Sequence, residues 1–500
     1  MDRKPQPDRH KDLRVVKFGG TSLASAEAIK QSAAVAIKNQ AGLIVVSATA
    51  GTTNELSDLV EKLTKIPSEK AVKQVEDLRS KHRKIARELK LSSASKKELD
   101  GLFEHLSNIV LSIVEGDYSS VLKELYPNRR HVYRQRIKDF PRSLDISMQA
   151  AKSIKRYSKR ISDHILSYGE FISSILINDA LAKAGADTEI VDARKIIKTD
   201  DNHRYATPLI DEISYYARKN IQPKLKQGKT IITQGFIGKA PDGSTTTLGR
   251  GGSDYSAALL AEAVGADELQ IWSDVAGVAT ADPKIVNNTK KISHLTFQEA
   301  AELATAGAKI LYPRTITPSR RSNIPVLVGN TFKPDEAGTR IEKSTSKKPL
   351  ITAVALKTKQ SLVTVTSERM AQEFGYMARI FEIFSKHKLS INQISTSEIA
   401  VAFTLEGYIS THEKMLQELK ELGEVTIENG MSLVSLIGND INNTPGLAGK
   451  IFSCLETKDS KIAIRMICQG ASKHNFCFVV EGKYGEESTR KLHKHFIEEG

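Results

Sequence analysis

Residues 245–255, with the sequence Thr-Thr-Thr-Leu-Gly-Arg-Gly-Gly-Ser-Asp-Tyr, concentrate side chains that could bind a ligand. The three glycines allow the main chain to approach a ligand closely, and Arg250 can hold a carboxylate in a bidentate fork. Asp254 could orient a lysine or a metal ion. A helix is expected directly afterwards, at residues 256–264. We interpret the segment as a ligand-binding loop rather than as a structural turn.

A second glycine turn follows the first expected strand, residues 14–18. Lys17 lies near the end of that strand, and Gly19 and Gly20 precede a helix whose N-terminus adds positive potential. Lys17 could therefore neutralise phosphoryl oxygens that the turn approaches. The turn is not a Walker loop, because the Gly-x-x-x-x-Gly-Lys-[Ser/Thr] spacing is missing.

Three further candidates lie on other segments. Residues 271–284 form a turn-rich loop after an apolar strand, and nucleotides tend to bind beyond the carboxyl edge of strands in open α/β sheets. Lys309 follows an expected helix. Glu170 is expected in a tight turn at residues 167–170, where it could receive a substrate ammonium. Taken singly, Lys309 and Glu170 are typical of surface residues, and only the other motifs favour a functional role.

The elements that must position these residues alternate between short apolar strands and helical stretches. Strands are expected at residues 14–18, 42–47, 188–192, 230–233, 268–272 and 325–328. Such alternation predicts an α/β fold with a mostly parallel sheet sandwiched by helices. Residues 56–169 give no strand signal and are expected to be helical.

The C-terminal part contains an internal repeat. Residues 362–365, Leu-Val-Thr-Val, match residues 433–436, Leu-Val-Ser-Leu, and Gly375 and Phe381 match Gly446 and Phe452, all at a spacing of 71. Each copy reads as strand, helix, strand, strand, which predicts two small ferredoxin-like α+β units. The pair could bind a small ligand where the units meet, or could only form a dimer interface.

Composition excludes several classes of protein. The chain is 40% hydrophobic and 26% charged, which is typical of a globular protein, and no apolar stretch reaches the length of a membrane span. Its three cysteines, Cys454, Cys468 and Cys477, show no metal-ligand spacing, so we expect no disulfide framework, no zinc site and a reducing, cytoplasmic compartment. The net charge is +14, and residues 61–160 hold 24 Lys and Arg against 13 Asp and Glu. We interpret that surplus as a solvated helical surface rather than as a nucleic-acid site.

Taken together, the motifs resemble those of the aspartate kinases (aspartokinases) of the amino acid kinase family, and specifically those of the lysine-sensitive monofunctional branch with C-terminal ACT domains. The resemblance covers residue 13 to the end. The segments that carry it are residues 17–22, 47–54, 169–170, 234–238, 245–255, 307–309, 438–440 and 465–468.

The resemblance implies a domain organisation and an activity. An amino acid kinase domain is expected at residues 13–330 with a helical insertion at about 60–165, then a linker at 331–349 and tandem ACT domains at 350–500, with repeats at about 360–430 and 431–490. The implied reaction transfers the γ-phosphate of ATP, with Mg²⁺, to the side-chain carboxylate of L-aspartate. The product, 4-phospho-L-aspartate, would enter lysine, threonine, methionine and diaminopimelate biosynthesis.

The resemblance also implies roles for individual residues. Lys17 and Lys309 would clamp phosphoryl oxygens, and Asp254 would hold the lysines in place. The implied nucleotide contacts are Lys17, Gly19, Gly20, Ser273, Asp274, Lys284 and Lys309. The implied aspartate contacts are Ser47, Thr53, Glu170, Arg250 and Ser253, with Arg250 on a carboxylate and Glu170 on the ammonium. No metal site made of protein ligands is expected.

An amino acid effector, with lysine first, is implied at the ACT domains, and the chain is expected to form a homodimer or homotetramer through them. The implied effector contacts are Met370, Glu373, Tyr376, Met377, Ile391, Asn392, Thr396, Ser397 and Glu398. Asn392 stands where the family has an aspartate, and Glu373 where it has a serine, so lysine is expected to bind with altered strength. Ala279 and Lys284 replace an aromatic residue and an arginine in the nucleotide loop.

Three other interpretations remain open from the sequence. The chain could phosphorylate another amino acid or carboxylate, could be a catalytically weak amino acid sensor, or could bind nucleic acid through its basic surface. The intact Lys17, Arg250, Asp254 and Lys309 oppose the second, and the pairing of Glu170 with Arg250 favours an amino acid substrate such as aspartate.

Overall fold

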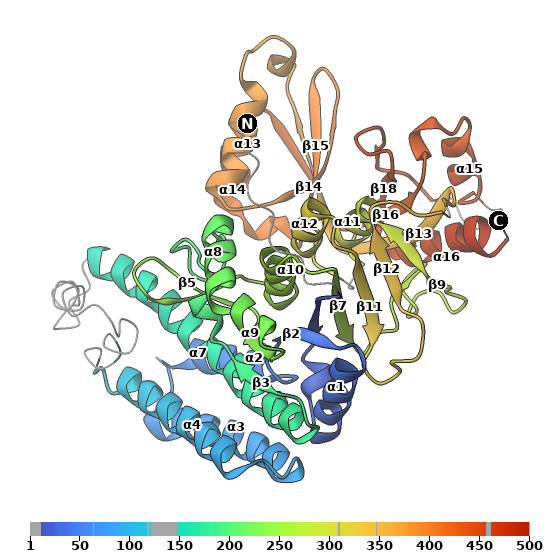
Figure 1. Cartoon of the computed structure of the whole chain (residues 1–500). Coiled ribbons are helices and arrows are strands. Elements are labelled where there is room, and N and C mark those ends of the chain that lie inside the picture. The colour runs from blue at the N-terminus through green and yellow to red at the C-terminus, as the bar shows by residue number, and fades with distance from the viewer. Residues whose placement is uncertain are drawn as a thin grey trace, which may run out of the picture. The chain divides into compact units, whose positions relative to one another are not determined.

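The computed structural model describes residues 12–63, 65–117, 121, 148–308, 311–346, 348–456 and 462–499, with residues 148–158 described by their backbone alone. The chain divides into two compact units. The first unit comprises Met1–Gly277 and Arg314–Lys343, and the second comprises Val278–Pro313 and Ser344–Gly500. Figure 1 labels their elements.

The first unit is built on a mostly parallel sheet. Its strands follow the spatial order β12-β11-β7-β1-β2-β4-β3, and β12 alone among them runs antiparallel to its neighbour, β11. The strands are β1 (Arg14–Phe18), β2 (Ala41–Val46), β3 (Thr188–Ile190), β4 (Thr230–Gln234), β7 (Glu268–Ser273), β11 (Val326–Asn330) and β12 (Thr339–Glu342). The predicted α/β fold is confirmed.

Helices cover both faces of this sheet, and the alternation of side chains along β1 shows how. Val16 and Phe18 join a core formed with α1 (Ala26–Lys38) and α7 (Met148–Lys183). Lys17 points to the opposite face, where it meets α10 (Gly252–Val264). The remaining helices of the unit are α2 (Thr52–Lys62), α3 (Ser68–Glu88), α4 (Ser93–Val114), α8 (Ile210–Asn220), α9 (Gln222–Lys226) and most of α12 (Pro313–Ser322).

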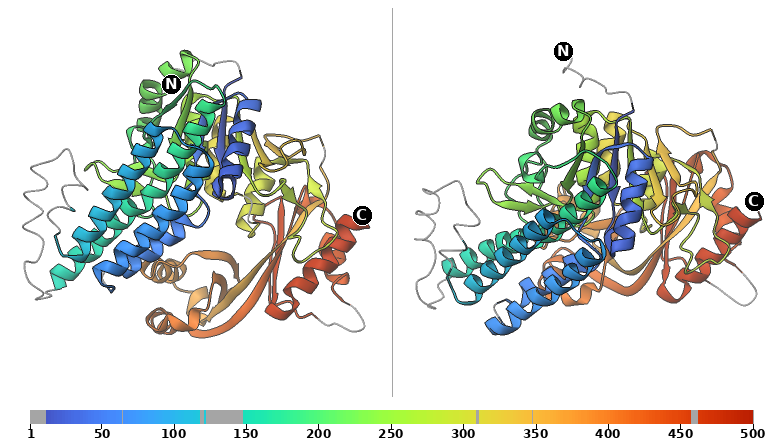
Figure 2. Two further views of the ribbon diagram at one scale, coloured as in Figure 1. Left: turned by 90° about the horizontal axis from the view of Figure 1, so that it is seen from below. Right: turned by 60° about the horizontal axis from the view of Figure 1, so that its bottom comes forward.

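The helical insertion packs onto the rest of the unit through apolar side chains. Leu78 of α3, together with Phe103 and Leu106 of α4, belongs to the same buried cluster as α1 and α7. Figure 2 shows α3, α4 and α7 as long helices lying side by side. Within the described residues, the predicted absence of strands from this stretch holds.

The second unit contains the two predicted repeats, and they share one antiparallel sheet of order β14-β15-β13-β16-β18-β17. Its strands are β13 (Ile351–Thr366), β14 (Ile391–Thr396), β15 (Ala400–Glu406), β16 (Glu424–Gly438), β17 (Met466–Cys468) and β18 (Asn475–Glu481). Helices α13 (Tyr376–Lys386) and α14 (Glu413–Lys420) belong to the first repeat, and α15 (Leu447–Ser453) and α16 (Gly485–His493) to the second. The unit also holds β8 (Val278–Ala279), β9 (Lys291–Ile292), β10 (His294–Thr296) and α11 (Phe297–Thr305).

The repeats are interleaved more closely than their sequence boundaries suggest. The second half of β13 and the first half of β16 pack in the core of the first repeat, through Val363 and Val365 with Val425 and Ile427. The first half of β13 joins the core of the second repeat through Val354. The repeat expected at 431–490 therefore takes one of its strands from residues before the first repeat.

The domain boundaries also differ from those expected. Residues 331–349 were expected to form a linker, but they contain β12, which pairs with β11. Residues 278–313, expected in the catalytic domain, group with the C-terminal repeats. In the described part of the chain, no helix combines the length and apolar character of a membrane span.

Candidate active site

A cavity of about 480 Å³ lies in the first unit, where the carboxyl ends of β1 and β2 meet the start of α10. It brings together residues predicted from separate motifs along the chain. Those that line it are Lys17, Gly20, Ser47, Thr53, Glu170, Arg250, Ser253 and Asp254. Residues of the phosphate turn and of the ligand-binding loop therefore lie around one cavity.

Lys17 and Asp254 form an ion pair inside this cavity. Lys17 Nζ lies 2.5 Å from Asp254 Oδ1, and the side chains are only 9% and 15% exposed. The helix α10 begins at Gly252, rather than at the expected Ser256, because Gly251 adopts a left-handed φ of 72° that starts the helix. Asp254 therefore occupies the first helical turn, where the helix dipole favours a carboxylate.

The glycine turn after β1 brings three segments together. The Gly19 N–H donates to the Trp272 carbonyl over 2.9 Å, which ties the turn to the end of β7. A Cβ on Gly19 would lie 3.7 Å from Lys17 Nζ and 3.8 Å from Ser273 Cβ, and one on Gly20 would lie 3.0 Å from the Ala48 carbonyl oxygen. A Cβ would therefore fit at Gly19 at ordinary van der Waals distances, whereas at Gly20 it would press on the Ala48 carbonyl, and the Gly19 N–H is already bonded to Trp272.

Glu170 lies within α7 and not in the expected tight turn. The adjacent Gly169 has a different explanation: a Cβ there would lie 2.7 Å from the Ala48 Cβ, so glycine lets α7 pack against the loop after β2. Glu170 Oε1 accepts a hydrogen bond from the Ala48 N–H at 3.2 Å. Its Oε2 is buried and has no hydrogen-bond partner among the described residues, and burial raises the pKa of Glu170 to about 8.

Arg250 lies between β6 (Thr245–Thr247) and α10, with its side chain exposed at the cavity. Within the described part of the chain it forms no ion pair, so its guanidinium is available to an anionic ligand. Ser47 and Thr53 add hydroxyls from the loop between β2 and α2, and Ser253 adds one from the first turn of α10. The cavity therefore offers a cation, a buried carboxylate and neutral hydroxyls around one space.

Helix α3 contributes a hydrogen-bond chain that the sequence did not reveal. His82 Nδ1 lies 2.8 Å from the Leu78 carbonyl, which can only accept, so Nδ1 carries the proton. Its Nε2, 2.8 Å from Thr49 Oγ1, then accepts from that hydroxyl, and Thr49 in turn accepts from Thr52 at 2.6 Å. Burial lowers the pKa of His82 to about 4, so the neutral ring persists at neutral pH.

Lys81, the neighbour of His82, holds the same loop from its outer side. Its ammonium donates to the Ala50 carbonyl at 3.0 Å and to Glu55 Oε1 at 2.8 Å. The helical insertion thus fixes the segment that presents Ser47 and Thr53 to the cavity. A long-range contact of this kind leaves no local pattern in the sequence.

Two further lining residues, Arg204 and Tyr205, were also missed. They belong to the loop between Asp200 and Thr207, whose sequence carries no recognisable motif. Tyr205 packs so closely on the ligand loop that a Cβ on Gly249 would lie 2.7 Å from its ring.

The other predicted nucleotide contacts are only partly placed. Ser273 and Asp274 follow the end of β7, half-buried and exposed respectively. Lys284 is exposed in the second unit, where its N–H donates to Asp282 Oδ1 at 2.9 Å, and Ala279 ends β8 in the same unit. Lys309 lies outside the described residues. The described residues include no cluster of three or more His, Cys, Asp or Glu side chains that could hold a metal ion.

The predicted effector contacts lie in the first repeat and fall into two groups. The apolar members, Met370, Tyr376, Met377 and Ile391, pack in or against its core. The Tyr376 hydroxyl donates to the Leu422 carbonyl at 2.6 Å, so that hydroxyl is already engaged.

The polar members differ in whether their side chains already have hydrogen-bond or ion-pair partners. The Asn392 amide accepts from Lys357 Nζ at 3.1 Å and donates to Gln360 Oε1 at 2.7 Å. Glu373 pairs with Arg369 at 3.1 Å and with Arg379 at 2.7 Å. The exposed members at the end of β14 are Thr396, Ser397 and Glu398.

Comparison with known proteins gives a consistent result. Residues 12–330 match the amino acid kinase family, and residues 434–496 match an ACT domain. Lysine-sensitive aspartokinase 3 of Escherichia coli is 37% identical over 97% of this chain and all of its own length. Chloroplastic aspartokinase 1 of Arabidopsis thaliana is 32% identical over 97% of this chain and 80% of its own length.

Solved structures agree with the sequence matches. Escherichia coli aspartokinase III in complex with aspartate and ADP, described as the R-state, superposes with a TM-score of 0.79 at 35% identity, covering 96% of this chain and 99% of that one. The T-state of the same enzyme, in complex with lysine and aspartate, gives 0.74 over 97% of this chain and all of that one. From these matches and the shared fold, the chain belongs to the aspartokinases of the amino acid kinase family.

Proposed function

We propose that this protein transfers the γ-phosphate of ATP to the side-chain carboxylate of L-aspartate, giving 4-phospho-L-aspartate. One observation carries the choice of substrate: Glu170 Oε2, which is buried and without a hydrogen-bond partner among the described residues, shares a cavity with the Arg250 guanidinium, which forms no ion pair among them. An amino acid satisfies both, because its ammonium can meet the carboxylate and its carboxylate can meet the guanidinium. The structure of Escherichia coli aspartokinase III with aspartate and ADP supports the assignment.

The chemistry requires positioning and charge neutralisation rather than a covalent intermediate. The substrate carboxylate is itself the nucleophile, and both it and the phosphate are anionic, so cations must lie between them. Lys17 is suited to this role because Asp254 holds its amine beside the glycine turn. Ser47, Thr53 and Ser253 would orient the amino acid through their hydroxyls, and Lys309 would supply a second amine.

The proposed nucleotide contacts are Gly19, Gly20, Ser273, Asp274 and Lys284, in addition to the two lysines. Mg²⁺ would be carried largely by the phosphates of ATP, since the described residues form no metal-binding cluster of their own. When bound, the ion would neutralise charge on the phosphoryl oxygens. ADP in the related structure supports the nucleotide.

Regulation by an amino acid is part of the same proposal. The relative from Escherichia coli is named lysine-sensitive, and its T-state structure contains lysine, which favours lysine as the effector at the ACT domains. We further propose a homodimer or homotetramer formed through these domains. The three free cysteines are consistent with a reducing cytoplasm as its location.

The direct test is to trap the acyl phosphate with hydroxylamine in the presence of ATP and Mg²⁺. Aspartate should give the hydroxamate, whereas succinate, which lacks the ammonium, and glutamate, which is longer, should give little. A Lys17→Ala variant should lose most turnover while a Lys30→Ala variant on the exposed face of α1 keeps it. Equal turnover of succinate and aspartate would refute the substrate assignment.

A further inference from the structure

Arg204 stands out on the wall of the cavity because its backbone adopts a φ of 74°. A residue with a Cβ adopts this left-handed conformation only at a cost, so the surrounding structure must hold it there. Such an unfavourable conformation at a ligand cavity is a reason to look for a function.

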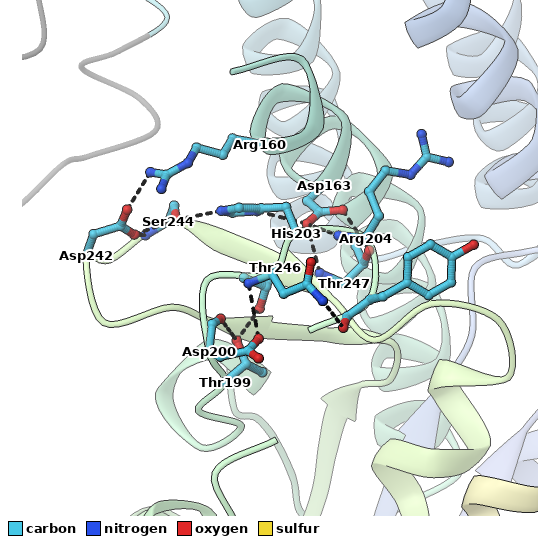
Figure 3. A network of polar contacts seen from close by, with 12 residues as sticks. Arg160, Asp163, Thr199, Asp200, His203, Arg204, Asp242, Ser244, Thr246 and Thr247 are labelled. Carbon is cyan, nitrogen blue, oxygen red and sulfur yellow. Dashed lines mark hydrogen bonds and ion pairs between the residues drawn. The ribbon is translucent and has the colours of Figure 1, made fainter. Parts of the chain in front are cut away.

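A buried carboxylate holds Arg204 in place. Asp163, on α7, is fully buried, and its Oδ2 accepts from the Arg204 N–H at 2.9 Å and from His203 Nδ1 at 2.9 Å. The same carboxylate accepts from the Thr247 N–H at 3.1 Å and from its hydroxyl at 2.7 Å. Figure 3 shows these bonds converging on Asp163, which ties the Arg204 loop to β6, the strand leading to Arg250.

The network continues on the far side of His203. His203 Nε2 lies 3.4 Å from Ser244 Oγ, and Ser244 donates to Asp242 Oδ1 at 2.5 Å. The buried Arg160 forms an ion pair with Asp242. Asp200 closes the other end of the loop by accepting from the Thr207 N–H at 2.8 Å. The loop is therefore fixed from both ends.

The Arg204 side chain takes no part in this network. In Figure 3 its guanidinium extends away from Asp163, and no interaction reaches it. Among the described residues it forms no ion pair, although Lys17 in the same cavity is paired with Asp254. The backbone is thus strongly held while the charged end is left available.

The charges of the cavity then match those of aspartate. Glu170 can meet the ammonium and Arg250 one carboxylate, while Lys17, beside the phosphate turn, is already paired with Asp254, so the Arg204 guanidinium is available to the second carboxylate. We propose that Arg204 binds the second carboxylate of aspartate, which is the side-chain carboxylate that asparagine lacks. Arg204 would thereby select a dicarboxylic amino acid over one with a neutral side chain. This inference rests on the proposed function. Asp163 acts as a positioning residue through the loop.

The test measures discrimination between aspartate and asparagine, whose amide replaces the side-chain carboxylate with a neutral group. In steady-state assays of the full chain, R204Q should raise the KM for aspartate about tenfold to a hundredfold. The inhibition constant of asparagine and the KM for ATP should change by less than about twofold, because neither ligand uses the pairing of Arg204 with the carboxylate. R204K should recover part of the affinity, and R218Q, on the exposed face of α8, should behave as wild type.

A second variant separates function from stability. R204G relieves the left-handed backbone and should melt no lower than wild type while losing aspartate affinity as R204Q does. Equal loss of affinity for aspartate and asparagine, or an unchanged KM for aspartate, would overturn the inference while leaving the proposed function intact. Failure of the wild-type protein to give the aspartyl hydroxamate would overturn both.

Discussion

Glu170 shows how one residue's surroundings set its chemistry. Its carboxylate is buried, one oxygen accepts from the Ala48 N–H, and the other has no hydrogen-bond partner among the described residues. Burial therefore raises its pKa to about 8, and the free enzyme keeps it mostly protonated at neutral pH. An incoming ammonium reverses this preference, because a nearby positive charge stabilises the carboxylate.

This environment predicts a pH dependence for aspartate binding. Below pH 8 the free enzyme must release the Glu170 proton to pair with the substrate ammonium, so the KM for aspartate should fall as pH rises from 6 to 8, by up to about tenfold per pH unit. Glu170→Gln should raise the KM about tenfold to a hundredfold and flatten this dependence. Initial rates at several pH values provide the measurement, with the KM for ATP as control. A flat wild-type profile between pH 6 and 8 would contradict the assignment.

At the scale of elements, the sequence predicted local features well and long-range contacts poorly. The strand with Lys17, the ligand loop with Arg250 and the loop after β7 were recognised because each carries its signal within a short segment. Glu170 was assigned to a turn, because a glycine beside a carboxylate is typical of turns and the contact of Gly169 with Ala48 is not visible in the sequence. Arg204 was missed for the same reason. Its loop is held in place by the buried Asp163 carboxylate on α7, and this contact is not visible in the sequence either.

Gly101 in α4 and Gly169 in α7 form a matched pair of positions for testing the close packing of α7 against Ala48. Gly169→Ala should destabilise the protein by about 1–3 kcal/mol, since its Cβ would lie 2.7 Å from the Ala48 Cβ. Gly101→Ala, at a position in α4 where a Cβ would meet nothing within 4 Å, should stabilise it by about 0.5–1 kcal/mol. Urea denaturation measures both, and Ala48→Gly should partly rescue the first. Similar effects of the two alanines would rule out close packing at Gly169.

The buried His82, through which α3 contacts the loop between β2 and α2, should make the free energy of unfolding depend on pH. Burial lowers the pKa of His82 to about 4, so the unfolded chain binds more protons than the native one between pH 4 and 6.5. Stability should therefore fall as pH decreases through that range. His82→Gln should reduce the slope without abolishing it, because burial also lowers the pKa of His164, to about 3. Unfolding free energies at several pH values test this, and an unchanged slope in the variant would show that His82 titrates normally.

The same helix should influence substrate affinity. His82→Phe leaves the buried Thr49 hydroxyl without its acceptor, which should cost about 1–3 kcal/mol of stability and raise the KM for aspartate by loosening the loop with Ser47 and Thr53. His82→Gln retains an acceptor and is the matched control. Loss of stability with an unchanged KM would indicate that the helical insertion supports the fold but not the site.

At the scale of the whole molecule, regulation requires that an amino acid bound to the ACT domains change the affinity or rate at the catalytic cavity. Such coupling is reciprocal for binding, so aspartate must weaken the effector by the same factor by which the effector weakens aspartate. Among the predicted effector contacts, Asn392 is neutral and Glu373 is already paired with Arg369 and Arg379. Glu398, exposed after β14, is the predicted effector carboxylate that forms no ion pair within the described residues.

We therefore expect L-lysine to inhibit the enzyme, with threonine and methionine as comparisons, and expect Glu398 to supply the charge that its ammonium needs. Glu398→Gln should raise the lysine concentration for half-inhibition about tenfold, while Glu413→Gln, on the exposed face of α14, should leave it unchanged. Initial rates are measured against lysine concentration at low and at high aspartate. The lysine concentration for half-inhibition gives the sensitivity to lysine, and its change with aspartate gives the reciprocal coupling. An unchanged rate at millimolar lysine and low aspartate would exclude lysine as the effector, because at low aspartate even a modest change in aspartate affinity alters the rate.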